Sequence, residues 1–272
     1  MLRTFSALLA CGVAALTVAS PARAITGGTD DGTGHPNVGL HYFTQADGTY
    51  RCSNTLIAPR LVLTAAHCTE NAIGKAQVTF DNPAPRSPAV TGDFSRFLGG
   101  TAYASPLWTG KLQNTALNDV GVIVLDAPAS SKFPGIQPVP LATPGLLDTL
   151  AAKGGLKKTA FTLVGYGVYF EKPDTGAQKK VAVSDRVRRV TTVGMQNLTS
   201  DVIKFQENDA NSTFGGGSCF GDSGGPAFLN GVQVRITSFG GAQFCTGMGG
   251  YQRVENAAAS AFVAGFLAAY PD

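Results

Sequence analysis

The segment Gly221-Asp222-Ser223-Gly224-Gly225-Pro226 surrounds one serine with residues that allow unusual backbone angles. A nucleophilic hydroxyl needs a turn of this kind, because it must be exposed while nearby backbone N–H groups point at the negative charge that develops on a substrate oxygen. A glycine-rich turn with an ordinary surface serine has the same composition. Whether Ser223 is a nucleophile therefore depends on partners elsewhere in the chain.

Two further segments carry side chains that could serve Ser223. His67 ends the run Leu63-Thr64-Ala65-Ala66 and directly precedes Cys68, so that a disulfide there would hold the imidazole in place. Asp119 precedes the apolar run from Val122 to Leu125. A lone histidine is more often an ordinary surface or core residue, and a lone aspartate a turn residue. Together they supply a base, an acid and a nucleophile in the chain order His, Asp, Ser, which is neither the Ser-Asp-His order of α/β-hydrolases nor the Asp-His-Ser order of subtilisin.

With these motifs the sequence resembles the trypsin/chymotrypsin-type serine proteases of family S1. The likeness runs from Ile25-Thr26-Gly27-Gly28, similar to the family's N-terminus after activation, to Ser238-Phe239-Gly240. It implies a secreted serine endopeptidase that hydrolyses peptide bonds through an acyl-enzyme, with His67 as base, Asp119 as the orienting acid and Ser223 as nucleophile. It also implies an oxyanion hole made by the N–H groups of Gly221 and Ser223. The family's acidic calcium loop has no clear counterpart between Thr69 and Phe94, so we expect no structural metal. We also expect no cofactor.

The resemblance also predicts a pocket for the P1 residue, which is the residue before the scissile bond. Its base falls on Gly217, where trypsin-like members carry an aspartate. With a glycine there, we expect a large apolar P1 residue, because a cation would lose its hydration without meeting a buried charge. Phe220 at the rim leaves open a preference for small residues. The implied substrate-binding residues are Gly217, Ser218, Phe220, Ser238, Phe239, Gly240 and Gly249.

Residues 1–24 are typical of a secretory signal peptide. Arg3 is followed by an apolar stretch from Phe5 to about Val18, and Ala22-Arg23-Ala24 is a small-residue cleavage site. Cleavage there would expose Ile25, whose new ammonium group, by the resemblance, pairs with Asp222, so that we expect no propeptide. A lipoprotein signal at Cys11 and cleavage after Ala19 that leaves a short pro-segment remain alternatives. We expect a secreted protein, extracellular or periplasmic, that is not held in a membrane after cleavage.

Four cysteines remain once the signal peptide is removed. An even number in a chain bound for an oxidising compartment predicts two disulfides, for which three pairings are possible. Zinc is the competing interpretation, but no pair has C-x2-C spacing. The family resemblance implies the pairs Cys52–Cys68 and Cys219–Cys245.

Composition and patterning favour an all-β chain. Only 14% of the 272 residues are charged and 34 are glycine, and without Arg3 and Arg23 there are 19 basic and 18 acidic residues. A nearly neutral chain gives no electrostatic reason for a nucleic acid or an anionic membrane as partner. By the family resemblance we expect protein or peptide substrates, and we expect a monomer. Short runs rich in β-branched and aromatic residues predict strands, and Asn256 is expected to cap a helix over 257–269. The predicted strands are residues 38–43, 55–57, 61–63, 77–80, 120–125, 161–164, 187–193, 203–206 and 232–238.

The family resemblance implies that these elements form two packed antiparallel six-stranded β-barrels with a C-terminal α-helix. We place the first barrel, with His67 and Asp119, in residues 25–140 and the second, with Ser223 and the helix, in residues 141–272. The segments 144–159 and 171–180 match no part of the family pattern. Two other functions stay open, namely a catalytically silent binding protein and a protease that processes one selected partner.

Overall fold

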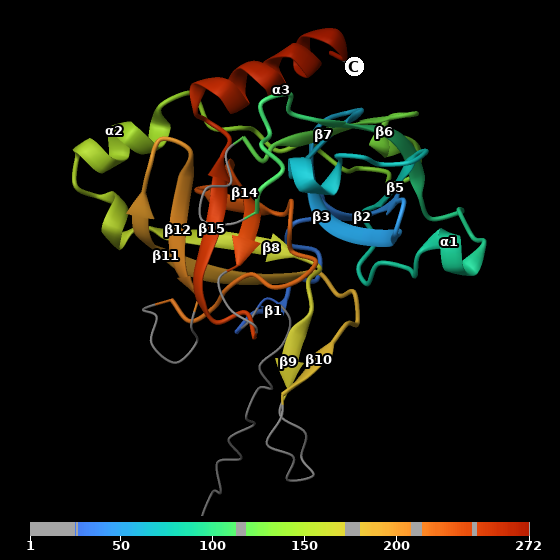
Figure 1. Ribbon diagram of the computed structural model, residues 1–272, viewed down its shortest axis with the longest axis horizontal. Coiled ribbons are helices and arrows are strands. Elements are labelled where there is room, and N and C mark those ends of the chain that lie inside the picture. The colour runs from blue at the N-terminus through green and yellow to red at the C-terminus, as the bar shows by residue number, and fades with distance from the viewer. Residues whose placement is uncertain are drawn as a thin grey trace, which may run out of the picture.

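The computed structural model describes residues 25, 27–112, 118–171, 180–207, 214–240 and 244–271. The predicted signal peptide and most of the loop 171–180 lie outside the described residues. The described chain forms two β-barrels, with one long helix along the top of the view in Figure 1.

Six antiparallel strands close the first barrel in the order β2-β3-β4-β7-β6-β5. β2 and β3 form a tight hairpin in which Gln45 pairs with Gly48. β7 is buried along its whole length, as its apolar sequence GVIVL requires. The strands are β2 (Val38–Gln45), β3 (Gly48–Ala58), β4 (Leu61–Thr64), β5 (Ala76–Thr79), β6 (Leu98–Ala104) and β7 (Gly121–Leu125).

The second barrel has the strand order β11-β12-β15-β14-β13-β8, and β8 also pairs with β11, which closes it. Two closed six-stranded barrels confirm the predicted fold class. A separate hairpin, β9 (Tyr169–Glu171) with β10 (Val181–Val183), projects below the barrels (Figure 1). The barrel strands are β8 (Ala160–Gly165), β11 (Arg189–Leu198), β12 (Val202–Glu207), β13 (Pro226–Leu229), β14 (Val232–Gly240) and β15 (Gly247–Arg253).

Helices are few among the described residues. α3 (Ala257–Ala269) has the predicted bounds, and the Asn256 side chain caps it by accepting a hydrogen bond from Ala259 N–H at 2.9 Å. The unassigned segment 144–159 contains a short helix that the sequence did not predict. The other helices are α1 (Pro88–Thr91), α2 (Leu146–Ala152) and the 3-10 turns η1 (Ala66–Cys68), η2 (Ala129–Ser131) and η3 (Leu156–Lys158).

The two ends of the described chain cross between the barrels. β1 (Thr29–Asp30) pairs with β11 of the second barrel, and Ile25 is buried in that barrel's apolar core. α3 in turn packs on apolar residues that come mainly from the first barrel, with Ala259 and Val263 buried there. Each barrel is therefore completed by a segment from the other half of the sequence.

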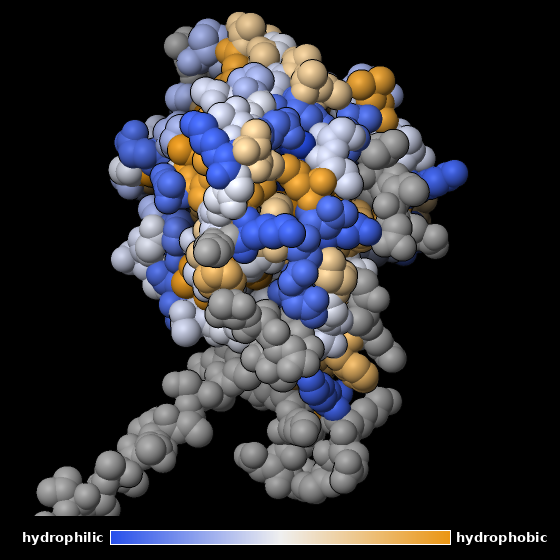
Figure 2. All heavy atoms as spheres, turned by 90° about the vertical axis from the view of Figure 1, so that its left-hand side faces the viewer, coloured by the Kyte–Doolittle hydropathy of each residue, from blue (hydrophilic) through white to orange (hydrophobic). Residues whose placement is uncertain are grey.

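Hydrophilic and hydrophobic residues are interspersed on the face that carries α2 (Figure 2). Among the described residues, no helix has the length and apolar character that crossing a membrane requires.

Candidate active site

His67 lies in the 3-10 turn η1, just after β4. Its Nδ1 lies 2.8 Å from Asp119 Oδ2, and its backbone N–H donates to Asp119 Oδ1 at 2.9 Å. The disulfide between Cys52 and Cys68 ties the next residue to β3. Donation from Nδ1 to the carboxylate leaves Nε2 as the nitrogen that can accept a proton.

Asp119 is fully buried and joins the two barrels. Besides His67, its Oδ2 accepts a hydrogen bond from Ser238 Oγ of β14 at 2.5 Å, and its backbone N–H donates to Gln252 Oε1 of β15 at 3.2 Å. A carboxylate that accepts three hydrogen bonds is held in one orientation, so the imidazole that it contacts is held as well.

The turn that carries Ser223 is built on two glycines with left-handed backbones, Gly221 at φ +97° and Gly224 at φ +79°. A methyl group at Gly224 would overlap Thr64 Oγ1, which is three residues before His67, so the serine turn packs directly on the strand that leads to the base. Ser223 C=O accepts from Ser53 N–H at 2.8 Å.

The backbone N–H groups of this turn divide into two sets. Those of Asp222, Gly224 and Gly225 donate to carbonyl groups within the protein. Within the described part of the chain, the N–H groups of Gly221 and Ser223 have no such acceptor. These are the two groups that the sequence assigns to an oxyanion hole.

A pocket opens beside Ser223. Five of the predicted substrate-binding residues line it, together with both cysteines of the disulfide Cys219–Cys245. Phe220 is 62% exposed, as expected for a residue at the rim. The lining residues are Ser218, Cys219, Phe220, Ser223, Thr237, Ser238, Phe239, Gly240 and Cys245.

The other two predicted pocket residues, Gly217 and Gly249, flank a residue that the sequence did not indicate. A methyl group at Gly217 would overlap Glu207 Cβ, and one at Gly249 would overlap the Glu207 carboxyl group. Glu207 therefore fills the space that the two glycines leave, where the family resemblance places the base of the pocket. The expectation of a large apolar P1 residue took no account of this carboxyl group, and it stays a prediction.

Asp222 is 2% exposed and lies under the serine turn. Its carboxylate accepts from Gly167 N–H at 2.7 Å and from Cys219 N–H at 2.8 Å. Burial, together with the nearby Glu207, raises the pKa of Asp222 to about 7, against the effect of these hydrogen bonds. The ion pair between Asp222 and an Ile25 ammonium group stays a prediction.

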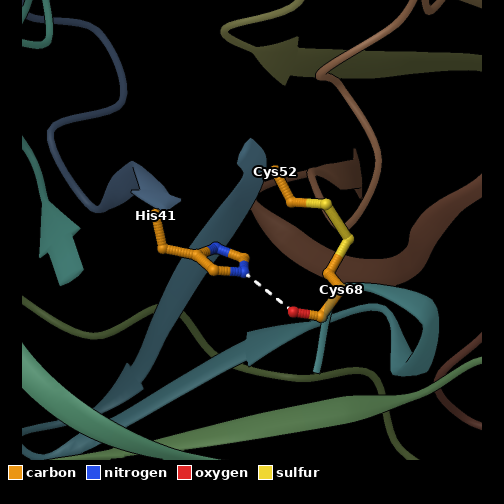
Figure 3. Close-up of side chains that lie close together, drawn as sticks. All are labelled: His41, Cys52 and Cys68. Atoms are coloured by element: carbon orange, nitrogen blue, oxygen red, sulfur yellow. Dashed lines mark hydrogen bonds between the residues drawn. A yellow bond between two sulfur atoms is a disulfide. The ribbon is translucent and has the colours of Figure 1, made fainter. Parts of the chain in front are cut away.

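His41, Cys52 and Cys68 lie close enough together to suggest a metal site. The two sulfur atoms are bonded to each other, however, and His41 Nε2 points at the Cys68 carbonyl oxygen 3.4 Å away (Figure 3). Because thiolates, not disulfides, bind metals, this cluster is structural. The two disulfides are those that the family resemblance implied.

Comparisons with known proteins agree with this geometry. The family model described as Trypsin matches residues 25–260. Brachyurin from Leptuca pugilator is 32% identical over 209 residues, which cover 73% of this chain and 80% of that protein. A trypsin from Saccharopolyspora erythraea is 29% identical over 229 residues, or 79% of this chain and 86% of that protein.

Among solved structures, HL collagenase superposes with a TM-score of 0.64 at 20% identity, covering 90% of this chain and 98% of that one. The likeness supports the two-barrel fold. From the family match and its relatives, we conclude that the chain belongs to the trypsin family of serine endopeptidases.

Proposed function

We propose that the protein is a secreted serine endopeptidase whose catalytic triad is His67, Asp119 and Ser223. The observation that carries the proposal is a continuous chain of contacts. Ser238 donates to Asp119, Asp119 holds His67, and Ser238 lines the same pocket as Ser223. A nucleophile, a base and an orienting acid in this relation perform acyl transfer on unrelated folds.

In this mechanism His67 Nε2 takes the proton of Ser223 Oγ as that oxygen bonds to the scissile carbonyl carbon. The N–H groups of Gly221 and Ser223 donate to the oxyanion that forms, and each such donor is worth roughly 3 kcal/mol in other enzymes. His67 then protonates the leaving amine as the C–N bond breaks. Water, deprotonated by His67, releases the acyl group and restores Ser223.

The substrate backbone has a place beside β14. Residues 238–240 of β14 run past the end of β13, whose first residue, Pro226, pairs with Ile236. An extended peptide can add to that edge as a further strand, a mode that binds many sequences. The two disulfides support an oxidising compartment, and the proposed enzyme acts as a monomer on protein or peptide substrates.

Replacement of the nucleophile tests the proposal. Ser223→Ala should lower the hydrolysis of casein or of an ester substrate by about 10⁶-fold, because only binding and the oxyanion hole remain. Ser131→Ala, a change of the same kind at an exposed position of η2, should keep full activity. A folded Ser223→Ala protein that hydrolyses these substrates at a comparable rate would exclude Ser223 as nucleophile.

A further inference from the structure

Glu207 is the last residue of β12, opposite Gly247 of β15. Its side chain points into the second barrel and is 2% exposed. The side chain lies between two glycines: Gly217 faces its Cβ and Cγ, and Gly249 faces its carboxyl group. A methyl group at either glycine would clash with Glu207. The Glu207 side chain can therefore occupy this place only because both neighbouring positions are glycine.

Hydrogen bonds connect this carboxyl group to the pocket wall. Its Oε1 accepts from Ser218 N–H at 2.9 Å and from Ser218 Oγ at 2.8 Å, and the Tyr251 hydroxyl also donates to it. Ser218 itself lines the pocket. Ser218 therefore links the buried carboxylate directly to the wall of the pocket.

The charge of Glu207 has no cationic partner in the described part of the chain. No lysine, arginine or histidine there lies within ion-pair distance of it, and the described groups that face it are Ser218, Tyr251 and, farther off, Asp222. A buried unpaired carboxylate is costly, and a cation brought to it recovers much of that cost. The cation that can reach this place is one carried by a substrate through the pocket.

We propose that Glu207 is the residue that determines P1 specificity, and that its carboxylate selects substrates with lysine or arginine at P1. The inference rests on the proposed function, since P1 is defined by the peptide bond that Ser223 attacks. A lysine or arginine side chain carries its cation at the end of a long flexible stem, so that the cation points into the pocket, toward Ser218 Oγ and the carboxylate that Ser218 contacts.

The selection should depend on pH in a defined direction. Burial raises the pKa of Glu207 to about 7, against the hydrogen bonds from Tyr251 and Ser218 that lower it. Above pH 7 the carboxylate is charged and favours a cationic P1 side chain. Below pH 7 the Glu207 carboxyl group is protonated and neutral, so it no longer favours a cationic P1 side chain. An apolar P1 side chain such as leucine or phenylalanine then competes.

The first test compares peptides that differ only at P1. For the wild type at pH 8.5, kcat/KM should be higher with lysine or arginine than with leucine or phenylalanine. The ratio of kcat/KM for lysine to that for leucine should fall about tenfold per pH unit below 7. Taking the ratio removes the titration of His67 and of Asp222, because those groups act on both substrates alike.

The matched variant is Glu207→Gln, which keeps the shape and an acceptor for Ser218 but removes the charge. It should lower kcat/KM for lysine and arginine substrates by about 100- to 1000-fold and change that for leucine less than about threefold. The ratio should then be independent of pH. Asp47→Asn, which removes an exposed carboxylate from the first barrel, should leave the ratio of kcat/KM for lysine to that for leucine, and its dependence on pH, unchanged.

A binding measurement separates the pocket from the chemistry. In a Ser223→Ala background, calorimetric titration with benzamidine at pH 8.5 should show binding that Glu207→Gln weakens by the same factor. If the wild type hydrolyses no peptide while benzamidine still binds in a Glu207-dependent way, the proposed function is contradicted and Glu207 keeps its role as a cation-binding group. A wild type that prefers leucine at pH 8.5, or a Glu207→Gln variant with an unchanged lysine-to-leucine ratio, would overturn the inference.

Discussion

At the scale of single residues, His41 is the buried group whose titration should be visible in stability. Its ring is fully buried, with Asn54 Nδ2 donating to Nδ1 at 3.2 Å and Nε2 facing the Cys68 carbonyl. Burial lowers the pKa of His41 to about 4, whereas an unfolded histidine titrates near 6.5. The neutral ring therefore contributes stability that is complete above pH 6.5 and is lost as the pH falls toward 4.

This predicts a pH-dependent difference between the wild type and His41→Gln, whose amide can keep both hydrogen bonds. Between pH 6.5 and 4, the unfolding free energy of the wild type should fall relative to that of the variant by about 1.4 kcal/mol per pH unit. Urea unfolding of both proteins from pH 4 to 8 measures this, and other titrating groups cancel in the difference. Parallel curves would show that His41 does not titrate in this range.

The residues of the site differ in how far the sequence reveals them. His67, Asp119 and Ser223 could be predicted because each stands in a characteristic local segment. Glu207 stands in no such segment, yet a signal exists: β12 alternates, and Glu207 lies on the same face as Ile203 and Phe205, which are buried. A charge on the inward face of a strand could have been noticed, but only the fold brings it to Gly217.

At the scale of elements, α3 shows how a helix far along the chain stabilises the first barrel. Phe262 and Phe266 pack on the apolar cluster of that barrel, and the Phe266 ring lies 5.2 Å from the ring of Tyr103 on β6. Phe266→Ala should lower the unfolding free energy by about 2 kcal/mol, less than for a fully buried phenylalanine. Leu267→Ala, one residue along and 37% exposed, should change it by less than about 0.5 kcal/mol. Equal effects in thermal unfolding would contradict this packing.

The three barrel strands that the sequence did not predict share a physical reason. β6 and β15 are rich in glycine, and β13 begins with proline. Both residue types have a low propensity for strands, so a reading of local sequence does not predict strands there. In the structure these glycines allow close packing: a methyl group at Gly250 would overlap the Phe239 ring, and one at Gly100 would overlap Ile123. Strands of β-branched residues such as β7 were found because their own composition specifies them.

At the scale of the whole molecule, we predict that the serine turn depends on the start of the mature chain. We predict that an Ile25 ammonium group pairs with Asp222, which would lower the pKa of that carboxyl group from the value of about 7 that burial produces without such a partner. The same pair raises the pKa of the ammonium group above its ordinary 7.7 to 8.0. The stability it contributes is present below pH 7.7 and is lost as the pH rises through the raised value.

Two recombinant forms test this, one that begins at Ile25 and one that keeps Ala24. The form that begins at Ile25 should be at least about 100-fold more active at pH 7 than the form that keeps Ala24. Only the first can form the ion pair with the buried Asp222, which is expected to order the turn that carries the oxyanion hole. Its activity should fall at alkaline pH as the ammonium group loses its proton. Comparable activity of the two forms would show that the pair is not required, and N-terminal sequencing of the secreted protein would give the natural start.

The crossing of the chain ends has a consequence for how the enzyme survives its own activity. β1 joins the sheet of the second barrel, and α3 covers the first barrel. Ser238 of the second barrel also donates a hydrogen bond to Asp119 of the first. A cut in the segment between β7 and β8 would therefore leave two fragments that still hold one another through packing and hydrogen bonds. Self-cleavage there would yield a nicked two-chain enzyme with its site intact, in place of two separated halves.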